Sequence, residues 1–457
     1  MTSDGKRGRA LVIGGSMAGL LAARVLADSY GEVTIVDRDE LPASPQHRRG
    51  VPQAHHAHAL LARGQQAFEE LFPGMTAELA ARGAPTGDML RDARLHFSGH
   101  RLVQATSGLS LVSASRILLE DEVRKRVSAL PRVTVARPCD VVGLTTAPDG
   151  ERVNGVRILP RTDGSAAEVF HADLVIDAAG RGSRAPAWLD ALGYPRPEED
   201  TLQIDLHYTS CRYRLGPDAL GGDLACVQAA TPSNPRAGVL ARLEGDQWLL
   251  TLAGILGDRP PTDVDGFLAF ARTLPFPDIF EAIRDAEALD EPRSYRFAAS
   301  VRRRFERVAR LPDAFLPLGD SICSFNPVYG QGMTVAALQA LVLRRHLRER
   351  GNLATRRVLR DFARVIDAPW DMARGADLAF PGVPGARPWP VRTLGRYIAR
   401  LHAAAAHDQR LAAAFVRVSG MVDQPASLMR PSVVVRVLWP RSAKARLAAS
   451  TTATAAQ

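Results

Sequence analysis

A glycine-rich turn between an apolar run and a helical pattern constrains this chain more than any other feature. Residues 9–13 (RALVI) are typical of a buried parallel strand, and Gly14-Gly15-Ser16-Met17-Ala18-Gly19 follows them directly. Helical spacing continues to Gly31, and a second apolar run ends at Asp37, 23 positions after the first glycine. This strand–turn–helix–strand order with a terminal acid is the context in which a glycine-rich turn binds a dinucleotide.

Each position of the turn has a physical role in such a site. Gly14 would make the tight turn, Gly19 would let the helix pack closely on the strand, and free N–H groups at the helix start would face a diphosphate. Asp37 would accept hydrogen bonds from a ribose diol. Ser16 replaces the second glycine of the usual fingerprint, but its hydroxyl can itself reach a phosphate. The turn therefore predicts an adenine dinucleotide and leaves NAD and FAD open; a nucleotide-free α/β fold is the alternative.

A second segment, PLGDSICSFNPVYGQGMT at residues 317–334, favours FAD. The apolar run before it ends at Asp320, whose carboxylate would hydrogen-bond a ribityl hydroxyl, and a helical pattern begins near Gly332. The N-terminus of that helix would face the negative charge that a flavin gains on reduction. Pro327 would stiffen the loop, while Gly330 and Gly332 would leave no side chain to block a flat ring.

With these motifs, residues 9–345 resemble the group A flavoprotein monooxygenases, the para-hydroxybenzoate-hydroxylase-like family. The similar segments are GGSMAG with Asp37, VSASRILLE at residues 112–120, and GDSICSFNPVYGQGM. The resemblance implies that Arg116 contacts the FAD phosphates, that the backbone of Val141 contacts adenine, and that Asp320 binds the ribityl chain. The expected cofactor-binding residues are Gly14, Gly15, Ser16, Met17, Ala18, Gly19, Asp37, Arg38, Arg49, Arg116, Val141, Asp320, Pro327, Gly330, Gln331, Gly332 and Met333.

The middle motif of the family is altered here. Two alanines separate Asp177 from Gly180, where the family has adjacent Asp and Gly, so the contact for NAD(P)H is left undefined. Residues 48–58 (RRGVPQAHHAH) and the loop NPVYGQGM also resemble bacterial flavin epoxidases that act on polyene intermediates of polyethers.

The resemblance implies an FAD-dependent monooxygenase that uses NAD(P)H as a diffusible reductant and O2 as oxidant. Its C4a-hydroperoxyflavin would transfer one oxygen atom to an apolar natural-product intermediate, with epoxidation of a polyene or terpenoid alkene favoured. Epoxidation needs no side-chain base, and no catalytic side chain is assigned, whereas phenol hydroxylation benefits from such a base. The open alternatives are an aromatic hydroxylase, a flavin-dependent reductase of isoprenoid double bonds, and a protein that holds FAD without turnover. A halogenase is disfavoured because the sequence lacks W-x-W-x-x-I-P.

Several residues are candidates for contact with a substrate. For the histidines at 55, 56 and 58, a place beside the flavin and an ordinary packing role both stay open, whereas a metal site is disfavoured because no acid or cysteine lies nearby. Trp248 lies on a strand-like run and either lines a cavity or belongs to the core. Arg48 and Arg49 would attract a phosphate of FAD or NAD(P)H, or form a solvated pair. The substrate-lining candidates are His55, His58, Tyr208, Trp248 and Tyr329.

Composition argues against several other classes. The formal net charge is +9, but the arginines are spread along the chain and no nucleic-acid motif accompanies them. No stretch is long and apolar enough for a membrane span, and the first residues do not form a targeting peptide. The four cysteines are scattered, which predicts neither disulfides nor zinc and fits a reducing cytoplasm. A monomer or homodimer is expected. Residues 432–439 form a short basic and apolar patch, for which contact with a membrane is a minor hypothesis.

These features predict an α/β protein, α+β overall. A Rossmann-like FAD-binding domain covers residues 1–190, with a small β layer at about 91–170, and resumes at 306–350. An inserted antiparallel sheet for the substrate covers 191–305. A C-terminal helical cap covers 351–449, broken by prolines from Pro369 to Pro390, and residues 450–457 form a frayed tail.

Overall fold

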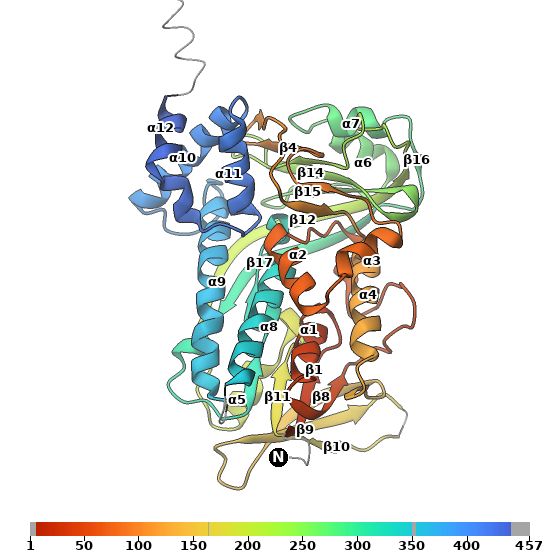
Figure 1. Cartoon of the computed structure of the whole chain (residues 1–457), viewed down its shortest axis with the longest axis vertical. Helices are drawn as coiled ribbons and strands as arrows, with labels where there is room; N and C mark the ends of the chain where they lie inside the picture. The colour runs from red at the N-terminus through yellow and green to blue at the C-terminus, as the bar shows by residue number, and fades with distance from the viewer. Residues whose placement is uncertain (1–5, 163, 350–352, 440–457) are drawn as a thin grey trace, which may run out of the picture.

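The computed structural model describes residues 6–162, 164–349 and 353–439, and the tail expected at 450–457 lies outside them. Figure 1 shows an elongated molecule with two stacked parts. One part holds the first turn, helices α1, α4 and α8, and a small β layer at its base. The other part holds a large sheet, with the C-terminal helices beside it. The α/β class expected from the sequence is confirmed.

A five-stranded parallel sheet carries the first turn. Its strands lie in the order β18-β11-β1-β2-β7, so the chain crosses over between neighbours as in a doubly wound fold. The apolar runs read from the sequence form its central strands, since both faces of these strands are buried. The bounds are β1 (Arg7–Ile13), β2 (Tyr30–Val36), β7 (Val133–Val135), β11 (Leu174–Asp177) and β18 (Phe315–Pro317).

A nine-stranded, mostly antiparallel sheet forms the second part. Its strand order is β19-β17-β12-β15-β14-β13-β4-β5, and β16 pairs with β12. Its bounds are β4 (Ala93–Phe97), β5 (His100–Arg101), β12 (Glu199–Arg214), β13 (Ala225–Gln228), β14 (Arg236–Arg242), β15 (Gln247–Gly254), β16 (Glu287–Ala288), β17 (Arg293–Arg303) and β19 (Cys323–Ser324). Two smaller sheets comprise β8 (Cys139–Thr146), β9 (Val153–Pro160) and β10 (Glu168–His171), and β3 (Thr86–Asp88) with β6 (Ser110–Val112).

The small β layer predicted at about 91–170 is narrower than expected. The hairpin β4–β5 forms about Ser98 and Gly99, both with positive φ, but β4 pairs in parallel with β13 and so joins the large sheet. The β4–β5 hairpin was predictable because its strands and turn are adjacent in the sequence. The pairing of residues 93–96 with 225–228 leaves no local sequence pattern, so the sheet to which the hairpin belongs could not be predicted. The domain boundaries drawn from the sequence stay predictions.

The helices of the two parts are linked through the long pair α8 and α9, which contact each other. Pro369 was expected to interrupt the helical sequence pattern of the C-terminal region. Instead it lies inside α9, where it is buried. The expectation was wrong because α9 packs an amphipathic face over its whole length, and that burial outweighs the cost of about 3 kcal/mol for an interior proline. The helices are α1 (Met17–Leu26), α2 (Ala62–Leu71), α3 (Met75–Ala81), α4 (Arg116–Ser128), α5 (Ala185–Ala191), α6 (Val264–Ala271), α7 (Asp278–Ile283), α8 (Gly332–Arg348), α9 (Thr355–Asp377), α10 (Trp389–Ala405), α11 (Gln409–Ser419) and α12 (Pro431–Leu438). Among the described residues, no helix combines the length and the apolar character that crossing a bilayer requires.

Candidate cofactor and substrate site

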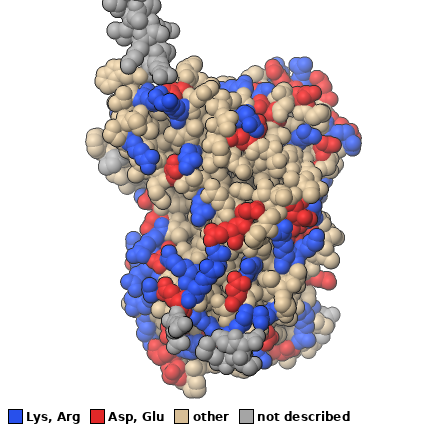
Figure 2. Space-filling view, viewed as in Figure 1, with Lys and Arg blue, Asp and Glu red and all other residues tan. Residues whose placement is uncertain are grey.

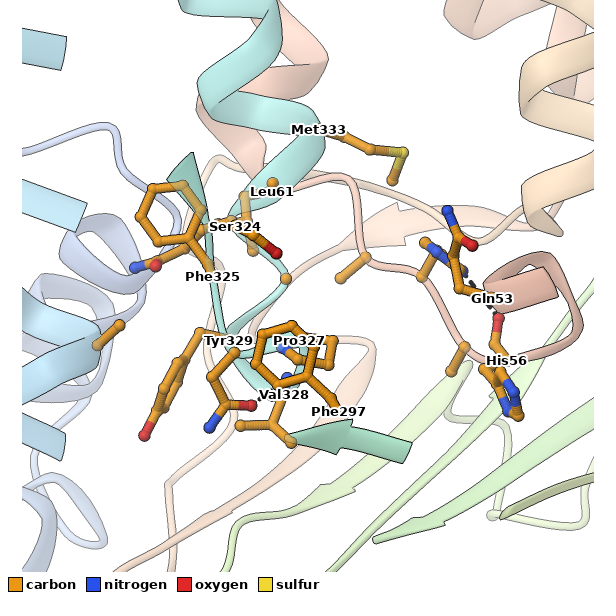
Figure 3. A pocket seen from close by; sticks show the side chains of 18 of the residues that line it. Gln53, His56, Leu61, Phe297, Ser324, Phe325, Pro327, Val328, Tyr329 and Met333 are labelled. Carbon is orange, nitrogen blue, oxygen red and sulfur yellow. Dashed lines mark hydrogen bonds between the residues drawn. The ribbon is translucent and has the colours of Figure 1, made fainter. Parts of the chain in front are cut away.

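One large cavity connects the two parts of the molecule. Its volume is about 1820 Å³, and its walls include the first turn, the loop at 325–333, the large sheet and the C-terminal helices. Small-molecule pockets usually measure about 300–1,000 Å³, so this cavity has room for a cofactor together with a substrate. Figure 3 shows the region where α8 begins, with Met333, Tyr329, Phe325 and Phe297 around it and Gln53 and His56 farther along the wall.

The first turn has the close backbone packing that its glycines predict. Gly14 has a φ of 99°, and a Cβ added there would lie 2.5 Å from the carbonyl oxygen of Ala178. A Cβ added at Gly19 would overlap the carbonyl oxygen of Gly14. Ser16 is the N-cap of α1, but its side chain does not cap the helix. The amide groups at the start of α1 therefore have no side-chain acceptor at the N-cap, which suits an anion at the cavity edge.

Asp37 lies directly after β2, at the edge of the cavity. Its Oδ2 accepts a hydrogen bond of 2.6 Å from the backbone N–H of Gly15, and its Oδ1 accepts one of 2.8 Å from Asp39. These bonds fix the carboxylate beside the turn. A position there suits the contact with a ribose diol that the sequence predicts.

A buried ion-pair network lies behind the turn. Arg116 donates to Ser16 Oγ at 2.9 Å and to Glu120 Oε2 at 2.6 Å, and Arg48 donates to Glu120 Oε1 at 2.8 Å. Burial alone would raise the pKa of Glu120, but the two guanidinium groups more than offset it and hold that pKa below its ordinary value. Nε of Arg116 is buried with no hydrogen-bond partner. An unsatisfied guanidinium donor beside a helix start fits a bound phosphate.

The second helix start lies next to the first. An added Cβ at Gly319, where φ is 66°, would lie 2.7 Å from Cβ of Ala18, so the segment that carries Asp320 packs directly on α1. Burial raises the pKa of Asp320 to about 6, although Arg116 and Arg181 act in the opposite direction. α8 begins at Gly332, as the sequence predicts. Gln331 also lines the cavity, and its Oε1 has no partner.

The loop before α8 is fixed by a buried carboxylate on α9. Asp377 Oδ1 accepts hydrogen bonds from Asn326 Nδ2 at 2.8 Å and from the hydroxyl of Tyr329 at 2.7 Å. Burial raises the pKa of Asp377 to about 6, while these two hydrogen bonds act against that rise. Gly330 continues the loop with a φ of 65°, a conformation that favours glycine. The cavity wall at Tyr329 is thereby tied to the helix that leads to the C-terminal region.

The end of the cavity that the large sheet lines, which we call the substrate side, is mostly apolar. It contains one buried chain of hydrogen-bonded polar side chains. His56 Nδ1 lies 2.8 Å from Ser210 Oγ, which lies 2.6 Å from Thr251 Oγ1. Its ring makes an edge contact with Tyr208 at 4.5 Å between centroids. Burial lowers the pKa of His56 to about 3 and that of His58 to about 4, so both imidazoles are neutral at neutral pH.

Most of the predicted site residues meet at this cavity. Gly15 and Gly19 lie in the turn but support it from behind rather than line the cavity. Those that line it are Gly14, Ser16, Met17, Ala18, Asp37, Arg38, His58, Arg116, Val141, Tyr208, Asp320, Pro327, Tyr329, Gly330, Gln331, Gly332 and Met333.

Three expected residues lie elsewhere. Arg49 and His55 line a separate surface pocket, where His55 stacks on His47 at 3.6 Å between ring centroids. Trp248 is fully buried in the core between the large sheet and α6 and α7, so of the two places left open for it, the cavity wall and the core, it occupies the core. Side chains alternate along β15, and it is Leu249, not Trp248, that faces the cavity.

Four residues that shape the site were not predicted from the sequence in the roles that the structure shows. Glu120 and Asp377 were not singled out, Arg48 was weighed as a phosphate contact or a solvated pair but not as a partner of Glu120, and His56 was not chosen over its two histidine neighbours. Arg48 and Glu120 are 72 positions apart, so no local pattern signals their pairing. The histidines at 55, 56 and 58 were noticed as candidates, but only the turn at 52–55 decides that His56 and His58 line the cavity whereas His55 does not.

The described residues fit FAD at both ends. The crowded backbone at Gly14, the unsatisfied Nε of Arg116 and the fixed carboxylate of Asp37 suit an adenosine diphosphate. The half-buried Asp320 and the glycine-lined start of α8 suit a ribityl chain and a flat ring. These two sets are the residues that would hold the cofactor.

No protein-family model matches this chain. It is 37% identical over 445 residues to Protein Rv3254 of Mycobacterium tuberculosis, an alignment that covers 93% of this chain and 92% of that protein.

Solved flavoprotein structures share the fold. p-Nitrophenol 4-monooxygenase PnpA from Pseudomonas putida DLL-E4 superposes with a TM-score of 0.61 at 14% identity, covering 92% of this chain and 100% of that one. The flavin-dependent brominase Bmp2 superposes with a TM-score of 0.60 at 14% identity, covering 90% and 97%. At such identities the likeness concerns the fold, which is that of the group A flavoprotein monooxygenases.

Proposed function

Because this chain belongs to the same family as Protein Rv3254 and has the fold of the group A flavoprotein monooxygenases, we propose that it is an FAD-dependent monooxygenase. It would use NAD(P)H and O2 to transfer one oxygen atom to an apolar small molecule. The favoured reaction is epoxidation of a polyene or terpenoid alkene.

The observation that carries the proposal is the convergence of two helix starts on one cavity. The start of α1, with Arg116 beside it, suits a diphosphate, and the start of α8, with Asp320 beside it, suits a flavin ring. Gly319 packs between the two helices, since a Cβ added there would lie 2.7 Å from Cβ of Ala18 in α1 and 4.0 Å from Cβ of Ala336 in α8. A single extended cofactor that carries both a diphosphate and a ring system satisfies both ends.

When bound, FAD supplies the redox chemistry and the activation of O2. The protein positions the cofactor and the substrate and excludes water from the site. Apolar side chains such as Phe297 and Leu249 exclude water from the substrate side, and the tie from Asp377 to Tyr329 fixes the wall against which the ring would lie.

The polar groups of the substrate side favour epoxidation over phenol hydroxylation. A base for phenol deprotonation works best with a pKa near the working pH. His56 and His58 have pKa values of about 3 and 4, and burial raises the pKa of Tyr208 above its usual range. None of these groups is suited to take a phenol proton, whereas an alkene has no proton to lose.

The purified protein, reconstituted with FAD, tests the proposal. We expect it to bind FAD, to oxidise NADPH or NADH, and to consume O2 faster when a polyene is added than without substrate. Phenols serve as the comparison for the hydroxylase alternative. Failure to bind FAD, or flavin that neither nicotinamide reduces, would contradict the proposal.

A further inference from the structure

The C-terminal helices expose an unusual amount of apolar surface. Half of the exposed large apolar side chains in the described part of the chain lie between residues 389 and 439. Trp389 is 70% exposed and Trp439 65%. We call these residues the docking face: Trp389, Leu394, Met429, Val435, Leu438 and Trp439. They lie on α10, on the short turn before α12 and on α12 with its last cap residue, and these elements contact one another.

The same region carries an excess of positive charge. Its described residues, 386–439, contain eight Arg and two Asp, an excess of six, while the formal net charge of the whole chain is +9. The two acids, Asp408 and Asp423, are paired with Arg436 and Arg417. Figure 2 shows this lobe as mostly tan with blue patches. Five exposed arginines of the described region have no acidic side chain within ion-pair distance: Arg392, Arg396, Arg400, Arg410 and Arg430.

The docking face is continuous with the cavity. Leu394 and Met429 are each 52% exposed, yet both also line the cavity that reaches the start of α8. An apolar molecule that enters between them would reach the flavin side of the cavity along apolar walls such as Ile398 and Phe415.

We propose that the docking face rests on an anionic lipid bilayer surface and that apolar substrate passes from the bilayer into the cavity between Leu394 and Met429. Exposed tryptophans beside unpaired arginines are the combination that interfacial helices use, since the rings enter the headgroup region and the guanidinium groups meet anionic headgroups. The statement about substrate rests on the proposed function; the statement about the surface does not.

A second copy of the chain is a less suitable occupant. In a twofold dimer the docking faces of the two subunits would pack against each other. The arginines of α10 in both subunits would then lie close together without acidic side chains to neutralise them. An anionic bilayer supplies both the apolar layer and the opposite charge.

Vesicle sedimentation with the FAD-reconstituted full chain tests the surface. We expect binding to phosphatidylcholine vesicles that contain phosphatidylglycerol, and much weaker binding to pure phosphatidylcholine. Removing three cations with Arg392→Ser, Arg396→Ser and Arg400→Ser together is expected to weaken binding about a hundredfold, from about 1 kcal/mol for each cation near an anionic surface. The pair Trp389→Ser and Trp439→Ser is expected to weaken it at least about tenfold.

A matched control is the pair Val169→Ser and Val264→Ser, which removes exposed apolar side chains of β10 and α6, away from the docking face. It is expected to leave binding unchanged. Wild-type protein that does not sediment with anionic vesicles, or variants that bind as wild type does, would overturn the proposal. So would a dimer in sedimentation velocity that Trp389→Ser and Trp439→Ser dissociate, because the face would then belong to a second copy.

Turnover of an apolar alkene separates this proposal from the proposed function. With the tryptophan pair replaced, we expect slower turnover of substrate presented in vesicles and unchanged turnover of substrate presented in detergent micelles. If the variant turned over substrate in vesicles as fast as the wild type does, the proposed route of substrate from the bilayer would be wrong. Absence of turnover in every protein and medium would instead contradict the proposed function, while vesicle binding would still decide the surface.

Discussion

Gly19 tolerates no side chain, because an added Cβ would overlap the carbonyl oxygen of Gly14. We expect Gly19→Ala to displace the turn, lower the stability by about 1–3 kcal/mol and abolish measurable retention of FAD. FAD titration and thermal unfolding check both effects. Gly216→Ala is the control, since Gly216 has open space around it and no positive φ. Normal FAD affinity in Gly19→Ala would contradict the assignment of the turn.

Arg116 carries the predicted phosphate contact. Hydrogen bonds to charged groups contribute about 1.5–3 kcal/mol each, so Arg116→Met is expected to weaken FAD about ten- to a hundredfold. Equilibrium titration of the apoprotein measures this change. Lys125→Met on the same helix is the matched control, because Lys125 is exposed and does not line the cavity. An unchanged dissociation constant for Arg116→Met would place the diphosphate elsewhere.

The residues that the sequence identified are those whose roles depend on near neighbours in the chain. Gly14, Gly19 and Asp37 belong to one strand–turn–helix–strand unit, so spacing alone indicated them. Glu120 was missed because its partner Arg48 comes from a distant segment. The place of Trp248 stayed open between cavity wall and core because alternation along a strand separates two faces without saying which face meets the cavity.

Among the elements, α8 and α9 together define the flavin side of the cavity. The start of α8 was predictable from its glycines, whereas the tie from α9 through Asp377 was not, since it joins positions 48 or more apart. That tie makes the loop at 326–330 part of a rigid wall rather than a free turn. Its buried carboxylate also gives the fold a pH dependence.

We expect Asp377→Asn to change the pH profile of stability. Because the pKa of Asp377 is raised to about 6 in the folded protein against about 3.9 when unfolded, the folded state holds its proton longer, and stability falls as pH rises through that window. The loss is about 3 kcal/mol and stays constant above about pH 6. Asparagine cannot ionise, so the stability of the variant relative to wild type is expected to rise by that amount between about pH 4 and about pH 7. Urea unfolding at each pH measures it; parallel profiles would contradict a buried, ionising Asp377.

At the scale of the whole molecule, we expect the two ends of the cavity to have separate roles, one in binding FAD and the other in accommodating the substrate. Ala253 lies on β15 of the large sheet, in the cavity wall and away from the turn at residues 14–19. We expect Ala253→Phe to leave FAD affinity unchanged and to lower kcat/KM for long alkenes at least about tenfold, with less effect on short ones, because the added ring fills substrate volume. Steady-state kinetics with alkenes of increasing length check this. A loss of FAD affinity would show that the two ends are not separate.

The central claim is that this cavity transfers one oxygen atom from O2 to an apolar substrate. The most direct measurement is the mass of the product formed from a polyene with FAD, NADPH and ¹⁸O2. The account predicts a product that has gained one ¹⁸O atom and no hydrogen. A product that has gained two hydrogen atoms without oxygen, or an untransformed polyene while NADPH is consumed, would contradict it.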